Sequence, residues 1–191
     1  GGIANISFDF KGKRLAYDIS PCNMILNFLA KKSGKDFDEY GKIASKGQVD
    51  KILLNKLDKI IYYDLNIPKS MGKECVNQYF IPVLNKSNKN NNDILATCVE
   101  HIAIKISNAL SEFNISKSLL TGGGVFNKYL VARILHHTKT QIIIPNKDLV
   151  NFKEAIVFGF LGLLRVLDKP NCLSSATGAI RDHSSGDIYM V

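Results

Sequence analysis

The chain has 191 residues, a hydrophobic content of 46% and a net charge of +8. A domain of this size buries about 70% of the surface that its unfolded chain exposes, and so much apolar content excludes disorder throughout. The lysines are scattered and form no basic helix with interleaved aromatic residues, so we predict no nucleic-acid partner.

Cysteine spacing and hydropathy exclude further classes of protein. The four cysteines are far apart, which excludes a zinc knuckle or a redox pair and predicts free thiols in a cytoplasmic protein. The histidines show no ligand spacing, so we predict no metal site formed by the chain, and His101 reads as a packed or surface side chain. The longest apolar run, residues 155–164, is shorter than the roughly 20 residues that cross a bilayer. It predicts a buried helix and no membrane span.

The first elements along the chain are strands followed by a helix. Residues 4–10 and 13–17 have strand character and are joined by a short turn. A helix is predicted over residues 21–30, with Ser20 as its N-cap and Pro21 in its first turn.

The middle of the chain reads as mostly helical. Residues 31–48 are polar and interrupted by glycines, which predicts a loop. Residues 49–63 have the apolar spacing of one amphipathic helix. After a surface loop over residues 86–92, Asp93 is predicted to cap a long helix. Its expected buried stripe is Leu95, Val99, Ile102, Ile106, Leu110 and Phe113.

The last third again alternates strands with helices. Residues 118–121 and the β-branched run 141–145 have strand character. Helices are predicted over residues 127–135 and 152–167, and a loop with one possible edge strand over residues 174–191. Such alternation favours an α/β layer architecture.

Glycine-rich turns carry the clearest functional signal. Gly122, Gly123 and Gly124 lie between a predicted strand and a predicted helix, with Asn127 at the start of that helix. Glycines there let the backbone approach a ligand closely, and the first amides of the helix point at it. This turn predicts a nucleotide cradle, although many such turns are merely tight.

A second turn opens the chain at Gly1 and Gly2, followed by Asn5. It reads either as a second phosphate-binding turn or as an ordinary hairpin start. Because a turn usually connects to something before it, we expect that residues upstream of Gly1 belong to the same protein.

Six motifs in order resemble one family. They are Gly1-Gly2-Ile3-Ala4-Asn5, Asp18-Ile19-Ser20-Pro21-Cys22-Asn23, Pro68-Lys69-Ser70-Met71-Gly72-Lys73-Glu74, Gly122-Gly123-Gly124-Val125-Phe126-Asn127, Glu154-Ala155 and Ala176-Thr177-Gly178-Ala179. The chain resembles the C-terminal half of anhydro-N-acetylmuramic acid kinases, which belong to the actin-like ATPase and sugar kinase superfamily. The resemblance implies that residues 1–191 form one RNase H-like lobe of a two-domain kinase. The Gly-Thr-Ser-x-Asp-Gly loop of the other lobe has no counterpart here.

The resemblance also implies the activity and its ligands. Such kinases hydrolyse the anhydro ring of 1,6-anhydro-N-acetylmuramic acid and phosphorylate it with ATP, giving N-acetylmuramic acid 6-phosphate in cell-wall recycling. It implies Mg²⁺ as the companion of ATP, and a homodimer. The alternatives are a non-catalytic nucleotide-binding module of actin-like fold and a kinase of a related anhydro sugar.

Site roles follow from the matching positions. Asp18 is the expected general base for the attacking water, or else a turn residue. In the family this aspartate more often precedes Thr-Gly-Pro-Gly-Asn, so Ser20 and Cys22 replace two glycines. Glu154 is the expected sugar-binding residue, or else a capping-box partner of Asn151. The Gly1, Gly2 and Asn5 turn and the Gly122, Gly123, Gly124 and Asn127 turn are the expected nucleotide-binding elements.

Overall fold

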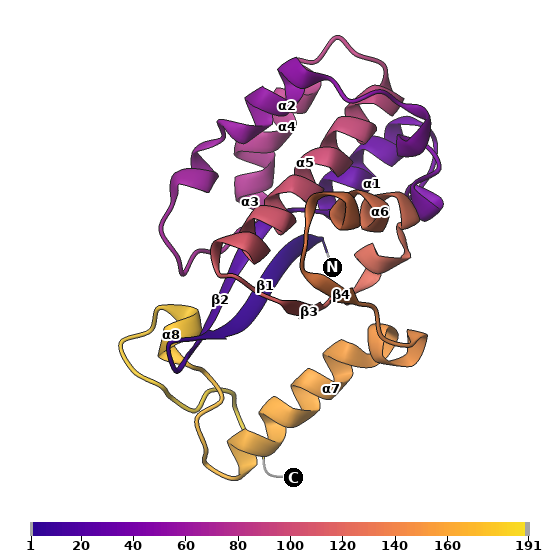
Figure 1. Ribbon diagram of the computed structural model, residues 1–191. Helices are drawn as coiled ribbons and strands as arrows, with labels where there is room; N and C mark the ends of the chain where they lie inside the picture. Colours follow the sequence, from indigo (N-terminus) through magenta and orange to yellow (C-terminus); the bar gives the residue numbers. More distant parts are fainter. Residues whose placement is uncertain (1, 190–191) are drawn as a thin grey trace.

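The computed structural model describes residues 2–189, and Figure 1 shows a layer of helices above two small sheets. Strands β1 (Ile3–Phe10) and β2 (Lys13–Pro21) form an antiparallel hairpin, and β3 (Lys117–Leu119) pairs in parallel with β4 (Gln141–Ile143). The expected mixed α/β architecture is confirmed. Gly1, which was expected to contact nucleotide, lies outside the described residues.

The helices come mostly from the central part of the chain. They are α1 (Asn23–Lys32), α2 (Lys51–Asp58), α3 (Lys73–Cys75), α4 (Ile81–Asn85), α5 (Asn91–Glu112), α6 (Lys128–His137), α7 (Lys147–Val166) and α8 (Ser174–Thr177). None of the helices within residues 2–189 has the length and apolarity required to cross a membrane.

Helix α5 runs through the centre of the helical layer and carries most of the core. Five of the six predicted stripe residues are buried as expected, and Phe113 at the helix end is partly buried. His101 is also fully buried on α5, which confirms that it packs. The imidazole forms a T-shaped pair with the Tyr63 ring, with the ring centroids 5.3 Å apart. Helices α1, α2 and α6 pack around α5, so this helix holds the layer together.

The first helix starts later than predicted. Strand β2 continues through Pro21, and α1 begins at Asn23 after Cys22, whose side chain makes no capping bond. The prediction of Ser20 as N-cap is wrong because Ser20 pairs with Ala4 in the hairpin and is fully buried. Its hydroxyl donates to the carbonyl oxygen of Pro21 at 3.1 Å instead.

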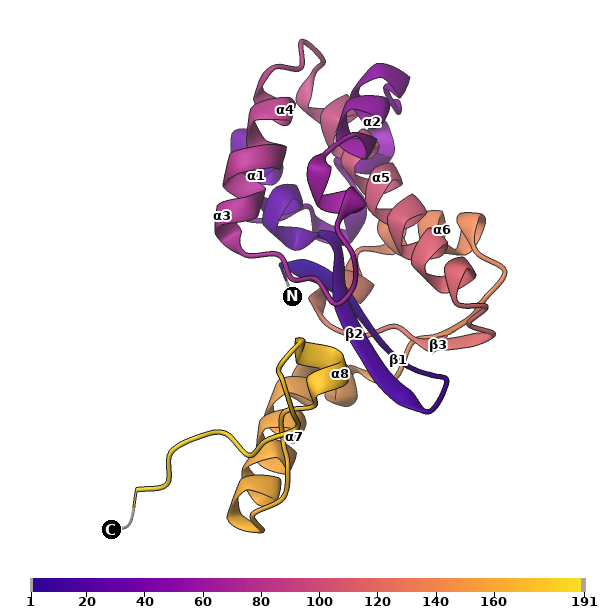
Figure 2. The same cartoon turned by 90° about the vertical axis from the view of Figure 1, so that its left-hand side faces the viewer.

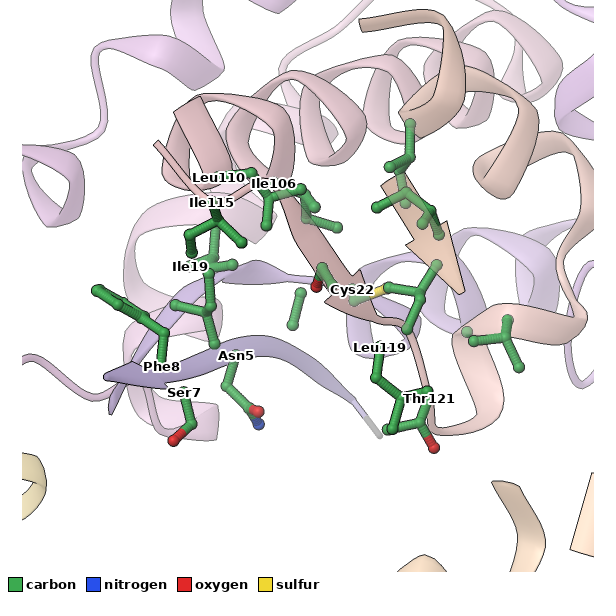
Figure 3. Close-up of a pocket in the computed structure, with 18 of the residues that line it drawn as sticks. Asn5, Ser7, Phe8, Ile19, Cys22, Ile106, Leu110, Ile115, Leu119 and Thr121 are labelled. Carbon is green, nitrogen blue, oxygen red and sulfur yellow. The ribbon is translucent and has the colours of Figure 1, made fainter. Parts of the chain in front are cut away.

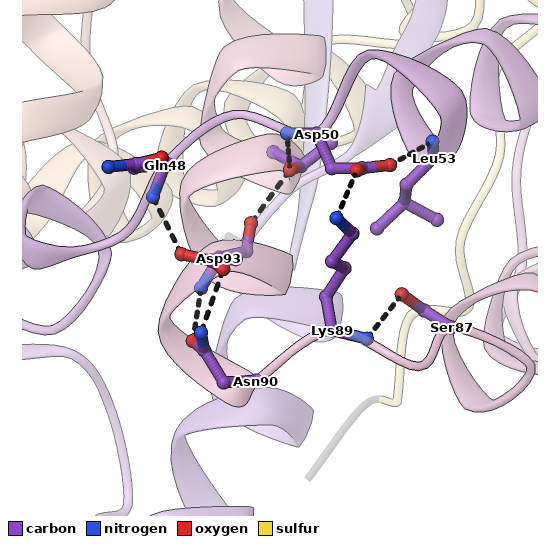
Figure 4. Close-up of polar contacts among 8 residues, drawn as sticks. Gln48, Asp50, Leu53, Ser87, Lys89, Asn90 and Asp93 are labelled. Carbon is purple, nitrogen blue, oxygen red and sulfur yellow. Dashed lines mark hydrogen bonds and ion pairs between the residues drawn. The ribbon is translucent and has the colours of Figure 1, made fainter.

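The starts of α2 and α5 are fixed by one polar cluster, shown in Figure 4. Asp50 caps α2, and its carboxylate forms an ion pair with the Lys89 ammonium group at 3.0 Å. Asn90 caps α5, so the prediction of Asp93 as its cap is wrong by three residues. Asp93 instead accepts hydrogen bonds from the Asn90 side chain and from the amide of Gln48, at 2.7 Å each. These contacts tie the preceding loop to the helix.

The helix predicted over residues 49–63 is broken in two. Helix α2 ends at Asp58, Ile60 is extended, and a 3₁₀ turn follows over Ile61–Asp64. Ile52 and Ile61 are 68% and 58% exposed, although one amphipathic helix would bury both. The apolar spacing therefore predicted one continuous helix where the structure has two short elements, and their apolar residues do not share one buried face.

Helix α7 departs most from expectation. It begins at Lys147 with Asn146 as its cap, so the predicted capping box between Asn151 and Glu154 is wrong. Figure 2 shows α7 set apart from the helical layer. The predicted burial of residues 155–164 is also wrong, since Phe158 is 70% exposed and Phe160 58%. A helix that is apolar all round normally lies inside a protein, and the described residues do not cover this one.

Candidate functional site

The glycine-rich turn is built as the sequence predicts. Gly122 has φ +85°, a conformation that L-residues with side chains rarely adopt, and a 3₁₀ turn over Gly123–Phe126 follows it. A methyl group on Gly123 would come no closer than 3.6 Å to Asn23, and one on Gly124 no closer than 3.7 Å to the Cys22 sulfur. Packing inside the described chain therefore does not demand glycine at these two positions, and the turn leaves room for a ligand.

Asn127 has a structural task at the end of this turn. Its side-chain oxygen accepts from the amide of Leu130 at 3.0 Å, which caps α6, and the residue is buried. That oxygen also lies against Gly41, where a Cβ atom would clash with it. The oxygen is therefore committed to capping, and a contact with ligand would have to use the amide nitrogen.

Two hollows flank the glycine-rich turn. The first, of about 450 Å³, is lined by Asn5 and Gly124 among others, so the structure brings the two expected nucleotide-binding turns together (Figure 3). The second, of about 770 Å³, is lined by Gly123 and Asn127 among others. Its rim carries three partly exposed aromatic rings, from Phe37, Tyr40 and Phe126.

Lysines reinforce the second hollow. The ammonium groups of Lys42 and Lys128 lie 5.3 and 5.1 Å from the centre of the Tyr40 ring, and Lys128 also lines the hollow together with Lys147. Asp38, in the same rim, is already satisfied because it accepts from the amides of Ile43 and Ala44 at 2.7 and 2.9 Å. The Glu39 carboxylate also lines the hollow and pairs with Lys42 at 3.2 Å, so the hollow combines flat apolar faces with charges of both signs.

Asp18 lies in strand β2, held from the opposite side by the segment that follows the 3₁₀ turn. Its carboxylate accepts from the Met71 amide at 2.7 Å, and its own amide donates to the Lys69 carbonyl at 3.0 Å. Its carbonyl accepts from the Tyr62 hydroxyl at 2.7 Å. The predicted end of the strand at residue 17 is wrong, because β2 continues for four more residues, through Pro21. The alternative of a turn residue is excluded for the same reason.

Asp18 lies outside both of the hollows that flank the glycine-rich turn. Its neighbours Ile19 and Cys22 line the first hollow and Asn23 lines the second, but the Asp18 side chain lines neither. The strand end that follows Asp18 is joined to the opening of the chain, because the backbone amide of Cys22 donates to the carbonyl of Gly2 at 2.8 Å.

Comparison with known proteins decides the family. The family model described as anhydro-N-acetylmuramic acid kinase matches residues 1–191, the whole chain. The chain belongs to the anhydro-N-acetylmuramic acid kinase family. It is 34% identical over 202 residues to the anhydro-N-acetylmuramic acid kinase of Coxiella burnetii (strain RSA 493), covering 99% of this chain and 54% of that protein. It is 30% identical to the same enzyme of Aliivibrio fischeri (99% and 54%) and 31% to that of Streptomyces coelicolor (98% and 50%). The chain spans about half the length of these relatives.

Glu154, which was expected to bind the sugar, lies on the exposed surface of α7. The structure does not bring it together with Asp18 or with the glycine-rich turn. Its neighbour Lys153 lines the first hollow, so α7 passes the opening of that hollow at this point.

Ser20 and Cys22, which were expected to replace two glycines of the family, are both buried. The Ser20 hydroxyl also meets the hydroxyl of Tyr63 at 3.2 Å, which ties β2 to the 3₁₀ turn. Burial raises the pKa of the Cys22 thiol to about 11, so this cysteine is protonated and unreactive at neutral pH. Both side chains thus contribute to packing.

Sequence reasoning missed the residues that hold Asp18. Tyr62 was read only as part of an amphipathic helix, and the Pro68-Lys69-Ser70-Met71 motif was given no role. Burial raises the pKa of Tyr62, and the Asp18 charge adds to the rise, so its hydroxyl is a secure donor. The motif itself was the available signal, because a Pro-Lys-Ser segment with no helix or strand period indicates a role other than forming a regular element.

A metal site made only of protein groups is not apparent. Within residues 2–189 there is no group of three or more His, Cys, Asp or Glu side chains placed to hold a metal ion. One oxygen of Asp18 is already used by the Met71 amide. The described residues therefore do not fit a resident metal.

Proposed function

We propose that the chain is part of an ATP-dependent kinase of 1,6-anhydro-N-acetylmuramic acid that gives N-acetylmuramic acid 6-phosphate. The match of the family model to all 191 residues is the observation that supports this most strongly. The first-mentioned relatives carry the same description but are about twice as long. We propose that the chain corresponds to their C-terminal, RNase H-like half, on the order of its six motifs. We further propose a cytoplasmic homodimer.

In this proposal Asp18 is the general base. Water attacks the anomeric carbon, and Asp18 takes the proton that the water loses. The bond from that carbon to O6 breaks, and O6 forms a bond to the γ-phosphorus of ATP as the bond to ADP breaks. The Met71 amide orients one carboxylate oxygen at 2.7 Å and leaves the other free to accept the proton.

ATP is proposed to bind along the glycine-rich turn. The turn of Gly122, Gly123 and Gly124, with the Asn127 amide nitrogen, would face the nucleoside, and the aromatic rim of the second hollow offers flat faces for a base. Gly1, Gly2 and Asn5 would approach the phosphates. Glu154 would bind the sugar. Mg²⁺ would be carried by the nucleotide phosphates, because the described residues form no cluster for it.

The test is turnover by the intact protein with ATP and the anhydro sugar in ¹⁸O-water. We expect ADP release with one ¹⁸O atom at the anomeric hydroxyl and none in the phosphate. Asp18→Asn should abolish turnover and retain ATP binding. Asp9→Asn is the matched control, since Asp9 is an exposed hairpin carboxylate paired with Arg14. Full turnover by Asp18→Asn would remove the base assignment.

A non-catalytic nucleotide-binding module is the second candidate. It is favoured by one observation, that the Asp18 side chain lines neither hollow beside the glycine-rich turn. The same assay separates the two candidates, because the module would bind ATP and release no ADP with the anhydro sugar or with related anhydro sugars.

A further inference from the structure

One buried ion cluster joins α6 to the centre of the helical layer. Glu100, in the middle of α5, is only 7% exposed. Its carboxylate accepts hydrogen bonds from Nε and Nη2 of Arg133, the latter at 2.8 Å, and from Nε2 of His137 at 2.7 Å. The proposed reaction uses none of these three side chains, so their role has to lie outside the chemical step.

The two partners of Glu100 lie one helical turn apart on α6, which packs beside α5 (Figure 1). Arg133 and His137 are four residues apart and project from one face of the helix, together with the buried Leu130 and Ile134. Apolar contacts are non-directional, so by themselves they allow one helix to slide or rotate on another. A carboxylate bound by the planar arginine fork and by a second donor one turn later fixes both the axial position and the rotation of α6.

The chemistry of the cluster favours placement over stabilisation. Taking charges out of water is costly, and apolar side chains of similar volume often stabilise a fold at least as well as a buried ion pair does. The best-attested use of such a pair is to select one arrangement among several that would pack equally well. The cluster is therefore suited to determine where α6 lies on α5.

Helix α6 carries the glycine-rich turn at its start. Asn127 ends the 3₁₀ turn over Gly123–Phe126 and caps α6, so the turn and the helix are continuous. The helix also contributes to both hollows, because Leu130 lines the first and Lys128 lines the second. A slip of α6 by one residue would displace the turn by about 1.5 Å along the helix axis. The position of α6 therefore decides where the turn meets a ligand.

We propose that Glu100 is a positioning residue of the nucleotide site, which holds α6 in the one register that places the glycine-rich turn against ATP. This inference rests on the proposed binding of ATP at that turn. Glu100 acts through Arg133 and His137, because its own side chain lines neither hollow. Loss of the cluster should therefore weaken the binding of ATP and leave the affinity for the anhydro sugar unchanged.

The experiment measures ATP binding by titration calorimetry, and thermal unfolding, for variants of the intact protein. In the triple variant Glu100→Leu/Arg133→Met/His137→Leu, apolar side chains replace the cluster, so the melting temperature should not fall. The dissociation constant of ATP should nevertheless rise at least about tenfold, which a role confined to stability would not produce. Arg133→Lys keeps the charge but loses the fork, so it should also weaken ATP binding.

Lys105→Met is the matched control. Lys105 also lies on α5, and its ion pair, at 2.8 Å, is with Asp58 of α2 and not with α6. Its loss should leave the dissociation constant of ATP unchanged. An equal weakening of ATP binding in Lys105→Met would overturn the proposal, because any ion pair of α5 would then have the same effect.

Hydrogen exchange adds a readout that needs no nucleotide. The amides of Val125 and Asn127 donate to the carbonyl oxygens of Gly122 and Gly124, and in the triple variant they should exchange faster while α5 stays protected. Wild-type ATP affinity in both the triple variant and Arg133→Lys would overturn the proposal, as would a triple variant that melts far below wild type. If the wild-type protein binds no ATP, the proposed function fails, and unchanged exchange at these two amides would then overturn the placement of the turn by Glu100 as well.

Discussion

The hydrogen bond from Tyr62 to the backbone of Asp18 predicts a loss of stability in Tyr62→Phe. Tyr62 is 2% exposed, and its hydroxyl donates to the Asp18 carbonyl at 2.7 Å. The change removes one neutral hydrogen bond and leaves a shielded carbonyl without its partner, so the free energy of unfolding should fall by about 1.5 kcal/mol, within the 1–3 kcal/mol that such an acceptor costs. With a urea slope of about 2 kcal/mol per molar, the unfolding midpoint should drop by roughly 0.7 M.

The assay is urea denaturation of residues 1–191, followed by far-ultraviolet circular dichroism. Tyr79→Phe is the matched control, because Tyr79 is 38% exposed and should change the midpoint little. Equal midpoints for Tyr62→Phe and Tyr79→Phe would show that the 2.7 Å contact does not stabilise the fold. The positioning of Asp18 by this tyrosine would then have to be abandoned.

Three further predictions address other parts of the fold. Burial favours the neutral form of Glu100, yet hydrogen bonds from Arg133 and His137 outweigh burial and hold the pKa of Glu100 below 4.5. The contribution of Glu100 to stability is therefore present above pH 4.5 and is lost as pH falls through the lowered pKa. Glu100→Gln should flatten the low-pH end of the stability profile in acid unfolding, and an unchanged profile would contradict this. Gly122→Ala should cost about 1–2 kcal/mol because φ is +85°, whereas Gly159→Ala on exposed α7 should be neutral or stabilising; equal melting temperatures would refute the turn argument. Cys22 should resist iodoacetamide at pH 8 in the native chain, as mass spectrometry can show, and rapid labelling would contradict its burial.

Helix and strand positions were predictable wherever one local pattern dominated. The stripe of α5 has a strict helical period over five turns, so burial followed directly from spacing. The glycine-rich turn was equally predictable, because three consecutive glycines indicate a backbone conformation that other residues rarely adopt. The φ of +85° at Gly122 is such a conformation. Helix caps were less predictable, since several polar residues lie near each helix start. Asn90 and Asp93 both suit a cap, and only the contact of Asp93 with the Gln48 amide decides between them.

The candidate site could be predicted only in part, because its supports come from distant segments. The bonds that hold Asp18 reach across 44 residues to Tyr62 and 53 residues to Met71, and no local period records such contacts. The expected burial of α7 failed for a related reason. Hydropathy indicates that Phe158 and Phe160 should be buried, but it does not indicate which segment buries them. The described residues do not bury them.

Helix α7 has a practical consequence for handling the chain by itself. Its aromatic and aliphatic side chains are exposed to solvent around the whole helix. One face of the helix carries a line of such residues, namely Phe152, Ile156, Phe160 and Leu163. Residues 1–191 should therefore bind chaperones during expression. Once purified, they should bind to hydrophobic resins and precipitate as they are concentrated. Mild detergent or polar replacements along that face should relieve all three behaviours without altering the helical layer around α5.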